Sequence, residues 1–130
     1  MRKQYHTRTV GKDTHTWDVH QLVRLSRQME PTAVPLSDIR ELDELWWFQT
    51  DDDPPTPRAI AEHIRLVRDT DLSFPIILCQ DAGLMDGMHR VLKALLEGRQ
   101  TIMAVRLCPT PPPDHVNVSL ADLPYPDEAI

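Results

Sequence analysis

The stretch FPIILCQDAGLMDGMHRVLKALL, residues 74–96, decides the fold of this chain. Its apolar run 74–79 predicts a buried strand, and the Asp-Ala-Gly chemistry in residues 80–83 predicts a tight turn. A short return strand through Met85 follows. Beyond it, apolar residues recur with helical spacing up to Leu96, which predicts an amphipathic helix. The stretch therefore indicates a hairpin that leads directly into a helix.

Five residues stand between the return strand and that helix, and they read Asp86-Gly87-Met88-His89-Arg90. Glycine allows a close approach of backbone or ligand, and the first amides of a helix carry partial positive charge that favours an anion such as phosphate. His89 and Arg90 lie in the first turn, where acidic residues are normally preferred, and broken local rules often mark functional sites. The alternative is that Asp86 is an ordinary N-cap and that His89 and Arg90 are solvated. The local sequence leaves both interpretations open.

Outward from this stretch, the pattern predicts an α/β (α+β) chain with a small mixed sheet and packed helices. The further expected elements are a weak strand around 6–10, a helix over 18–29, a short strand over 32–36, a helix from Thr56 and Pro57, and a strand over 101–107. The expected buried helix positions are Ile60, Ile64 and Val67 in one helix and Val91, Leu92, Leu95 and Leu96 in the next, which Gly98 caps. We divide the chain into a polar N-terminal segment (1–15), one domain (16–108) and a Pro-rich acidic tail (109–130) that forms no packed core.

Composition limits the classes of function. The chain has 130 residues and a net charge of −6, which disfavours broad attraction to DNA or to an anionic membrane surface. No run of about 18 apolar residues predicts a membrane span, and residues 1–6 lack the apolar core of a signal peptide. Cys79 and Cys108 have no metal-type spacing and are expected to be free buried thiols, so we expect a cytoplasmic protein.

Trp46-Trp47-Phe48 is the second informative patch. Three consecutive aromatic residues cannot all face one core, so we expect two to cover the core and one, for which we take Trp47, to form a wall against a base or a partner. The run 51–53 consists of three aspartates and is read as a solvated turn rather than a metal site. Among the histidines only His89 has a positional argument, while His63 is expected to border the core or a pocket.

Three segments together resemble the ParB/sulfiredoxin-like domain. They are residues 75–78, residues 85–90 with the helix that follows, and residues 100–106. The upstream segments 34–39 and 58–67 also fit. We call Asp86–Arg90, within the second segment, the box. The resemblance covers residues 32–107 and implies that family's fold. It also implies nucleotide-phosphate binding at the box.

The box differs between the branches of that superfamily. Met88 occupies the position of the sulfiredoxin cysteine and cannot form a thiolate, which argues against sulfiredoxin activity. Chromosome-partition proteins carry a further helix-turn-helix domain, for which this chain has no room, so DNA binding is disfavoured. Asp86, Gly87, His89 and Arg90 match best the box of kinases that phosphorylate free serine.

That last resemblance implies ATP or ADP as the nucleotide, with Mg²⁺, or another phosphorylated small molecule. Gly87 and the following amides, Met88 included, would hold a phosphate, and Arg90 would supply a planar donor fork. His89 would be catalytic by donating a hydrogen bond and, depending on its pKa, a positive charge. Asp86 would cap the helix or help to hold a metal. The catalytic acid is expected from a set of three that sequence alone does not separate: Glu41, Asp43 and Glu44.

A non-enzymatic interpretation remains beside it. The box would then bind a ligand that regulates an adaptor module, and the aromatic patch and acidic tail would contact a protein partner. Pairing of two copies of the chain through exposed aromatic residues is also left open.

Overall fold

Four strands form the sheet that carries residues 74–96. They are Thr32–Pro35 (β3), Ile76–Leu78 (β4), Leu84–Asp86 (β5) and Thr101–Arg106 (β6), arranged in the order β3-β6-β4-β5. β4 pairs with β6 in parallel, whereas β3 with β6 and β4 with β5 are antiparallel. The computed structural model describes residues 3–126, and in this range it confirms a small mixed sheet with packed helices, an α+β fold.

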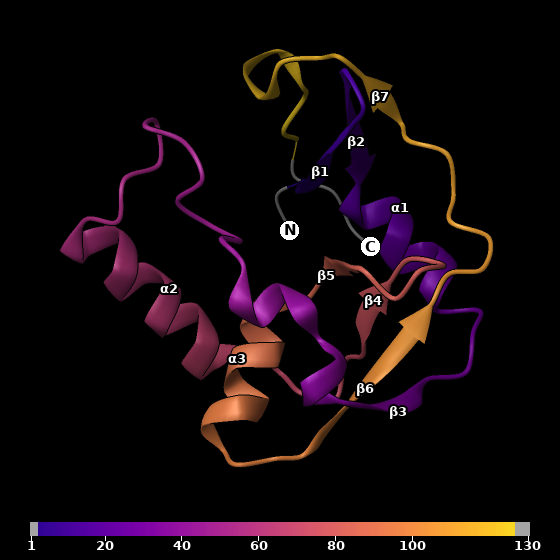
Figure 1. Ribbon diagram of the computed structural model, residues 1–130, viewed down its shortest axis with the longest axis vertical. Helices are drawn as coiled ribbons and strands as arrows, with labels where there is room; N and C mark the ends of the chain where they lie inside the picture. Colours follow the sequence, from indigo (N-terminus) through magenta and orange to yellow (C-terminus); the bar gives the residue numbers. More distant parts are fainter. Residues whose placement is uncertain (1–2, 127–130) are drawn as a thin grey trace.

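Residues 3–126 contain three α-helices, which are Val19–Ser26 (α1), Pro57–Asp69 (α2) and Met88–Leu96 (α3). Two begin at side-chain caps, because Asp18 accepts from the His20 N–H and Thr56 accepts from the Ala59 N–H. The long connection between β3 and α2 also contains two short 3₁₀ helices, Leu36–Asp38 (η1) and Arg40–Asp43 (η2). In Figure 1 this connection crosses in front of α3, and α2 lies on the outer side of α3.

The sheet is covered on both faces, and β4 shows why. Side chains alternate along a strand, so Ile76 and Leu78 pack on the α3 side while Ile77 and Cys79 pack on the α1 side. All four are buried, which explains the unbroken apolar run in the sequence. The core therefore consists of two layers, and the strand that precedes the box lies between them.

A second sheet lies beside the first and was not predicted. Strands Tyr5–Val10 (β1) and Asp13–Asp18 (β2) form a hairpin, and His115–Val116 (β7) pairs with β2. The expected strand at 6–10 is thus present, but its hairpin runs across the boundary expected after residue 15. A further 3₁₀ helix, Leu120–Asp122 (η3), follows β7.

The segment after residue 108 is packed as far as residue 126, so the expectation of a tail without packing is wrong for this part. The Trp17 indole N–H donates to the Pro111 carbonyl at 2.9 Å, and Leu123 is buried. Prolines remove backbone donors but leave carbonyl acceptors and apolar rings, so a Pro-rich segment can still pack beside a sheet. Residues 127–130 of the predicted tail lie outside the described residues.

Several burial predictions are also wrong. Ile60 and Ile64 of α2 and Leu95 and Leu96 of α3 are exposed, with exposed fractions of 53% for Ile64 and 79% for Leu96. The reason is geometric: α2 packs on α3 rather than on the sheet, so only Val67 of its apolar stripe is buried. Cys108 is exposed because it lies beyond the end of β6, whereas Cys79 is buried as expected.

Candidate functional site

Gly87 is the N-cap of α3, and its conformation requires glycine. Its φ of +112° is one that side chains with a Cβ rarely adopt. A Cβ built there would lie 2.7 Å from Ile76 Cγ2 and 2.9 Å from an Arg90 terminal nitrogen. The absence of a side chain therefore allows β4 and Arg90 to approach the start of the helix.

The start of α3 has no side-chain cap, unlike α1 and α2. Its first internal backbone hydrogen bond runs from the Val91 N–H to the Gly87 carbonyl. The amides of residues 88–90 precede that bond and have no partner inside the helix. The expectation that Asp86 caps the helix is wrong, and the predicted phosphate cradle is left open at this end.

Asp86 instead pairs with Arg90. The guanidinium donates to the Asp86 carboxylate at 3.1 Å, and the same nitrogen donates to the Pro75 carbonyl at 3.3 Å. This contact ties the last residue of β5 and the entry of β4 to α3. Arg90 Nε is buried and has no hydrogen-bond partner among the described residues. Arg90 is thus held in place through one terminal nitrogen of its guanidinium, and the expectation that it is simply solvated is wrong.

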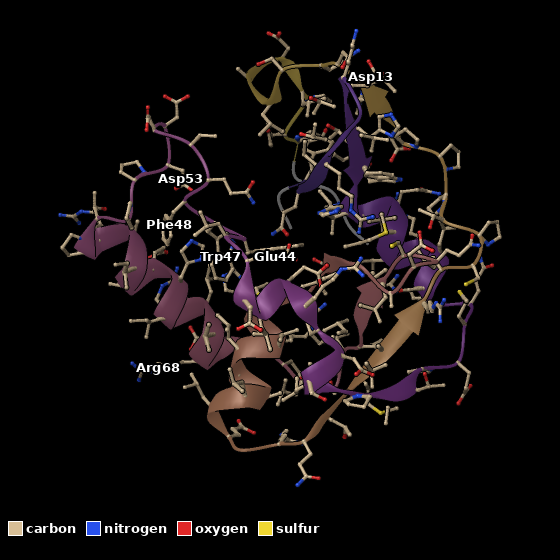
Figure 2. All side chains as sticks on the ribbon, in the orientation of Figure 1. Asp13, Glu44, Trp47, Phe48, Asp53 and Arg68 are labelled. Atoms are coloured by element: carbon tan, nitrogen blue, oxygen red, sulfur yellow. The ribbon has the colours of Figure 1, made fainter. Side chains whose placement is uncertain are left out.

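His89 is hydrogen-bonded to a residue that sequence reasoning placed only near a pocket. His63 Nδ1 of α2 and His89 Nε2 lie 2.9 Å apart. The Trp47 ring stacks on both imidazoles, with centroid distances of 4.0 Å to His63 and 4.6 Å to His89. Phe48 meets His63 edge-on at 5.5 Å. Figure 2 shows Trp47 and Phe48 on the loop that leads to α2.

That loop holds a strained residue next to the pair. Phe48 has a φ of +61°, which is uncommon for a bulky residue, and its N–H donates to the Asp53 carboxylate at 3.0 Å. Of the three aspartates 51–53, Asp53 therefore has a structural role, because it fixes the backbone at Phe48. Among residues 3–126, no group of three His, Cys, Asp or Glu side chains could hold a metal ion.

His89 has the electrostatics of a neutral imidazole. Burial, the nearby His63 and the Arg90 guanidinium lower the pKa of His89 from 6.5 to about 4. His89 therefore contributes hydrogen-bonding atoms rather than positive charge near pH 7. The charge at this end of α3 is carried by Arg90, which Asp86 offsets.

The three acids expected to include a catalytic base have different environments. Glu41 is 8% exposed, pairs with Arg40 at 3.6 Å, and leaves one carboxylate oxygen buried without a partner. Asp43 and Glu44 are exposed. Within the described part of the chain, none of the three is hydrogen-bonded or ion-paired to the box, so their role stays a prediction.

Two other residues near the box have structural contacts. The Met88 side chain is buried in the core with Ile76 and Val91, so only its backbone N–H is available to a ligand. Lys93 donates to the carbonyls of Arg68 and Thr70 at the end of α2, so it secures the α2–α3 packing.

His63 is the residue that sequence reasoning most nearly missed. Its signal was a helical position three residues after Ile60, beside an aromatic triplet in the preceding loop, but its partner depends on how two helices pack.

Comparison of the chain with models of protein families, with curated proteins and with solved structures found no match. The relation to the ParB/sulfiredoxin-like superfamily therefore stays a prediction. Within residues 3–126, no helix has both the length and the apolar character to cross a membrane.

Proposed function

We propose that this chain binds a phosphate-bearing ligand, a nucleotide such as ATP or ADP, at the start of α3. The observation that carries the proposal is the open N-terminus of α3 after Gly87, which has no side-chain cap hydrogen bond within residues 3–126. Unpaired amides and the helix dipole together favour a phosphate group. The resemblance of the Asp86–Arg90 box to the ParB/sulfiredoxin-like domain supports the same conclusion.

Each residue of the box has a definite part in this proposal. The amides of residues 88–90 hold one phosphate, and the part of the Arg90 fork that faces away from Asp86 donates to a second oxygen. His89 is a neutral hydrogen-bonding group. Mg²⁺ would reach the site with the nucleotide, because magnesium binds substrate phosphates together with few protein oxygens.

In its finer form, the proposal is a small-molecule phosphotransferase related to the free-serine kinases. Phosphoryl transfer requires mainly positioning and charge stabilisation, which the amides and Arg90 provide. An acid of the set Glu41, Asp43 and Glu44 would orient the acceptor hydroxyl. Among them Glu41 is favoured, because its buried unpartnered oxygen is available for a new hydrogen bond.

A specific observation favours a second candidate function, a non-catalytic module that binds a protein partner. Apolar side chains stand exposed on the outer helices and on the loop before them, namely Leu45, Ile60, Ile64, Leu95 and Leu96. Such side chains can mark an interaction surface. Nucleotide binding without turnover would favour this function over the phosphotransferase.

The test is a titration of thermal stability with ATP, ADP, CTP and GTP, with and without Mg²⁺. A ligand at 100 times its Kd stabilises the folded state by about 2.7 kcal/mol, which raises Tm by several degrees. Arg90→Ala removes a charge-assisted hydrogen bond of about 1.5–3 kcal/mol and should weaken binding about tenfold or more.

Arg99→Ala is the matched control, because it removes the same charge near the other end of α3. Arg90→Ala also leaves Asp86 unpaired, so the comparison uses the ligand-induced change in Tm, not the Tm without ligand. No shift with any nucleotide on the natural chain, or equal shifts in both variants, would overturn the assignment of phosphate to the box.

A further inference from the structure

We propose that His63 and His89 form a proton relay, in which His63 positions His89 and passes a proton between the bound ligand and solvent. The inference rests on the proposed function, because the proton that moves belongs to the acceptor hydroxyl of the proposed phosphotransfer. It concerns His63, a residue on a different helix from the box.

The geometry of the two rings identifies a true hydrogen bond. The nitrogens are 2.9 Å apart, while the ring centroids are 5.2 Å apart with an interplanar angle of 26°. Rings that stacked face to face would have much closer centroids for the same contact, so the imidazoles meet edge to edge. The shared hydrogen therefore lies near both ring planes, as a strong hydrogen bond requires.

Trp47 fixes this arrangement. Its ring lies over both imidazoles at interplanar angles of 28° and 23°, so one indole covers the hydrogen-bonded pair. Phe48 closes the edge of His63 at 89°. Both histidines are thus held in orientation by aromatic contacts as well as by their own hydrogen bond.

The two outer nitrogens are accessible. His63 Nε2 and His89 Nδ1 have no hydrogen-bond partner among the described residues, yet neither is among the fully buried unpartnered atoms of the protein. Each therefore reaches solvent. A pair with one internal hydrogen bond and two open ends can take up a proton at one end and release one at the other.

The proton transfer begins and ends with both imidazole rings neutral. At the start, His89 carries its proton on Nε2 and donates to His63 Nδ1, and His63 carries its proton on Nε2. As the oxygen of an acceptor hydroxyl bonds to the transferred phosphorus and the bond from that phosphorus to the nucleotide breaks, His89 Nδ1 takes the hydroxyl proton. The Nε2 proton of His89 passes to His63 Nδ1, and His63 Nε2 releases its proton to water. Both rings end neutral in the opposite tautomers, and one proton has moved from the acceptor hydroxyl to solvent.

The charged groups around the pair come from α2, α3, β5 and the loop before α2. Arg90 on α3 and Asp86 on β5 lie beside His89 and are paired with each other, and Glu62 precedes His63 on α2 and pairs with Arg65. The loop places the uncharged Trp47 and Phe48 rings against the pair, and the Asp53 carboxylate on the same loop accepts from the Phe48 N–H. Because the Arg90 cation near His89 disfavours an imidazolium there, the His89 end of the relay is neutral near pH 7.

The test is ¹⁵N NMR of the histidine rings in the natural chain and in two variants, His63→Gln and His63→Leu. Glutamine can keep the hydrogen bond to His89 but cannot relay a proton, and leucine removes both. We expect His63 Nδ1 and His89 Nε2 to show matched shifts of two exchanging tautomers in the natural chain. His89 should be held in one tautomer in His63→Gln and lose its hydrogen-bonded signal in His63→Leu.

His115→Gln on the distant β7 is the control and should leave the His89 signals unchanged. Backbone spectra of each variant check that the fold is kept. His89 shifts that are the same with and without His63 would overturn the relay.

A titration with inorganic phosphate on the same samples separates the two proposals. Phosphate at the box should move the His89 and His63 signals together in the natural chain. In His63→Gln, which has no ring at position 63, phosphate should still move the His89 signals. If phosphate moves neither ring, the proposed function fails, whatever the tautomers show. If phosphate moves His89 but His63 does not follow in the natural chain, the relay fails and phosphate binding stands.

Discussion

Gly87→Ala is the substitution with the clearest structural consequence. Alanine must adopt a φ of +112°, which costs about 1–3 kcal/mol for a residue with a side chain. Its Cβ would also lie 2.7 Å from Ile76 Cγ2 and 3.1 Å from Ile76 Cβ, on a core strand that cannot move freely. Overpacking of this kind costs about 1–3 kcal/mol more. We therefore expect a loss of about 2–6 kcal/mol in the free energy of unfolding.

Gly98→Ala is the matched control, because Gly98 also has a positive φ, +74°, but a Cβ at this position would meet nothing within 4 Å. It should lose only the conformational part, about 1–2 kcal/mol. Urea unfolding followed by circular dichroism measures both, and the midpoint should move with little change in slope. If Gly87→Ala loses no more than Gly98→Ala, the close approach of β4 to the start of α3 is refuted.

Two further predictions concern acid stability and the packed C-terminal segment. Burial, with the nearby Arg8 guanidinium, also lowers the pKa of His6 to about 4, so the unfolded chain binds more protons than the folded chain at both His6 and His89 between pH 6.5 and about 4. The contribution of both histidines to the free energy of unfolding is therefore fully present above pH 6.5 and should be lost as the pH falls below it. The loss is at most about 1.4 kcal/mol per pH unit for each group, and less for the half-buried His89. A glutamine at either position should flatten this fall, measured as urea midpoints at each pH. In the same assay, Leu123→Ala should lower the free energy of unfolding by about 2–4 kcal/mol, because Leu123 is 5% exposed. Leu120 is 51% exposed, so Leu120→Ala should change it by less than about 0.5 kcal/mol. Equal losses in the two variants would contradict the packing of this segment.

Local signals predicted the part of the fold that local physics controls. The unbroken apolar run into β4 and the turn chemistry after it identified the hairpin, and Thr56 followed by Pro57 identified the start of α2. These features depend on strand alternation, on turn propensity and on capping, all of which act over a few residues. The mixed sheet followed from them.

Contacts between distant segments explain what sequence could not predict. The β1–β2 hairpin is built of mostly polar residues, and Trp17 at its end is secured by a carbonyl 94 residues away. Ile64 has the spacing of a buried residue, but its helix packs on another helix rather than on the sheet. The histidine pair depends on the same packing of α2 on α3, so the positional argument reached His89 and only the neighbourhood of His63.

The charges at the start of α3 also follow from tertiary contacts. A histidine and an arginine in a first turn oppose the helix dipole, and the sequence alone made this an anomaly. The structure removes most of the conflict, because Asp86 offsets the charge of Arg90 and the surroundings of His89 keep it neutral. A first turn whose cations are neutralised still presents its uncapped amides, and these remain the strongest positive feature there. An anion bound at this point would therefore interact chiefly with the backbone. Arg90→Lys keeps the charge but not the planar fork, whereas Gly87→Ala displaces the amides themselves. Arg90→Lys should therefore weaken anion binding less than Gly87→Ala.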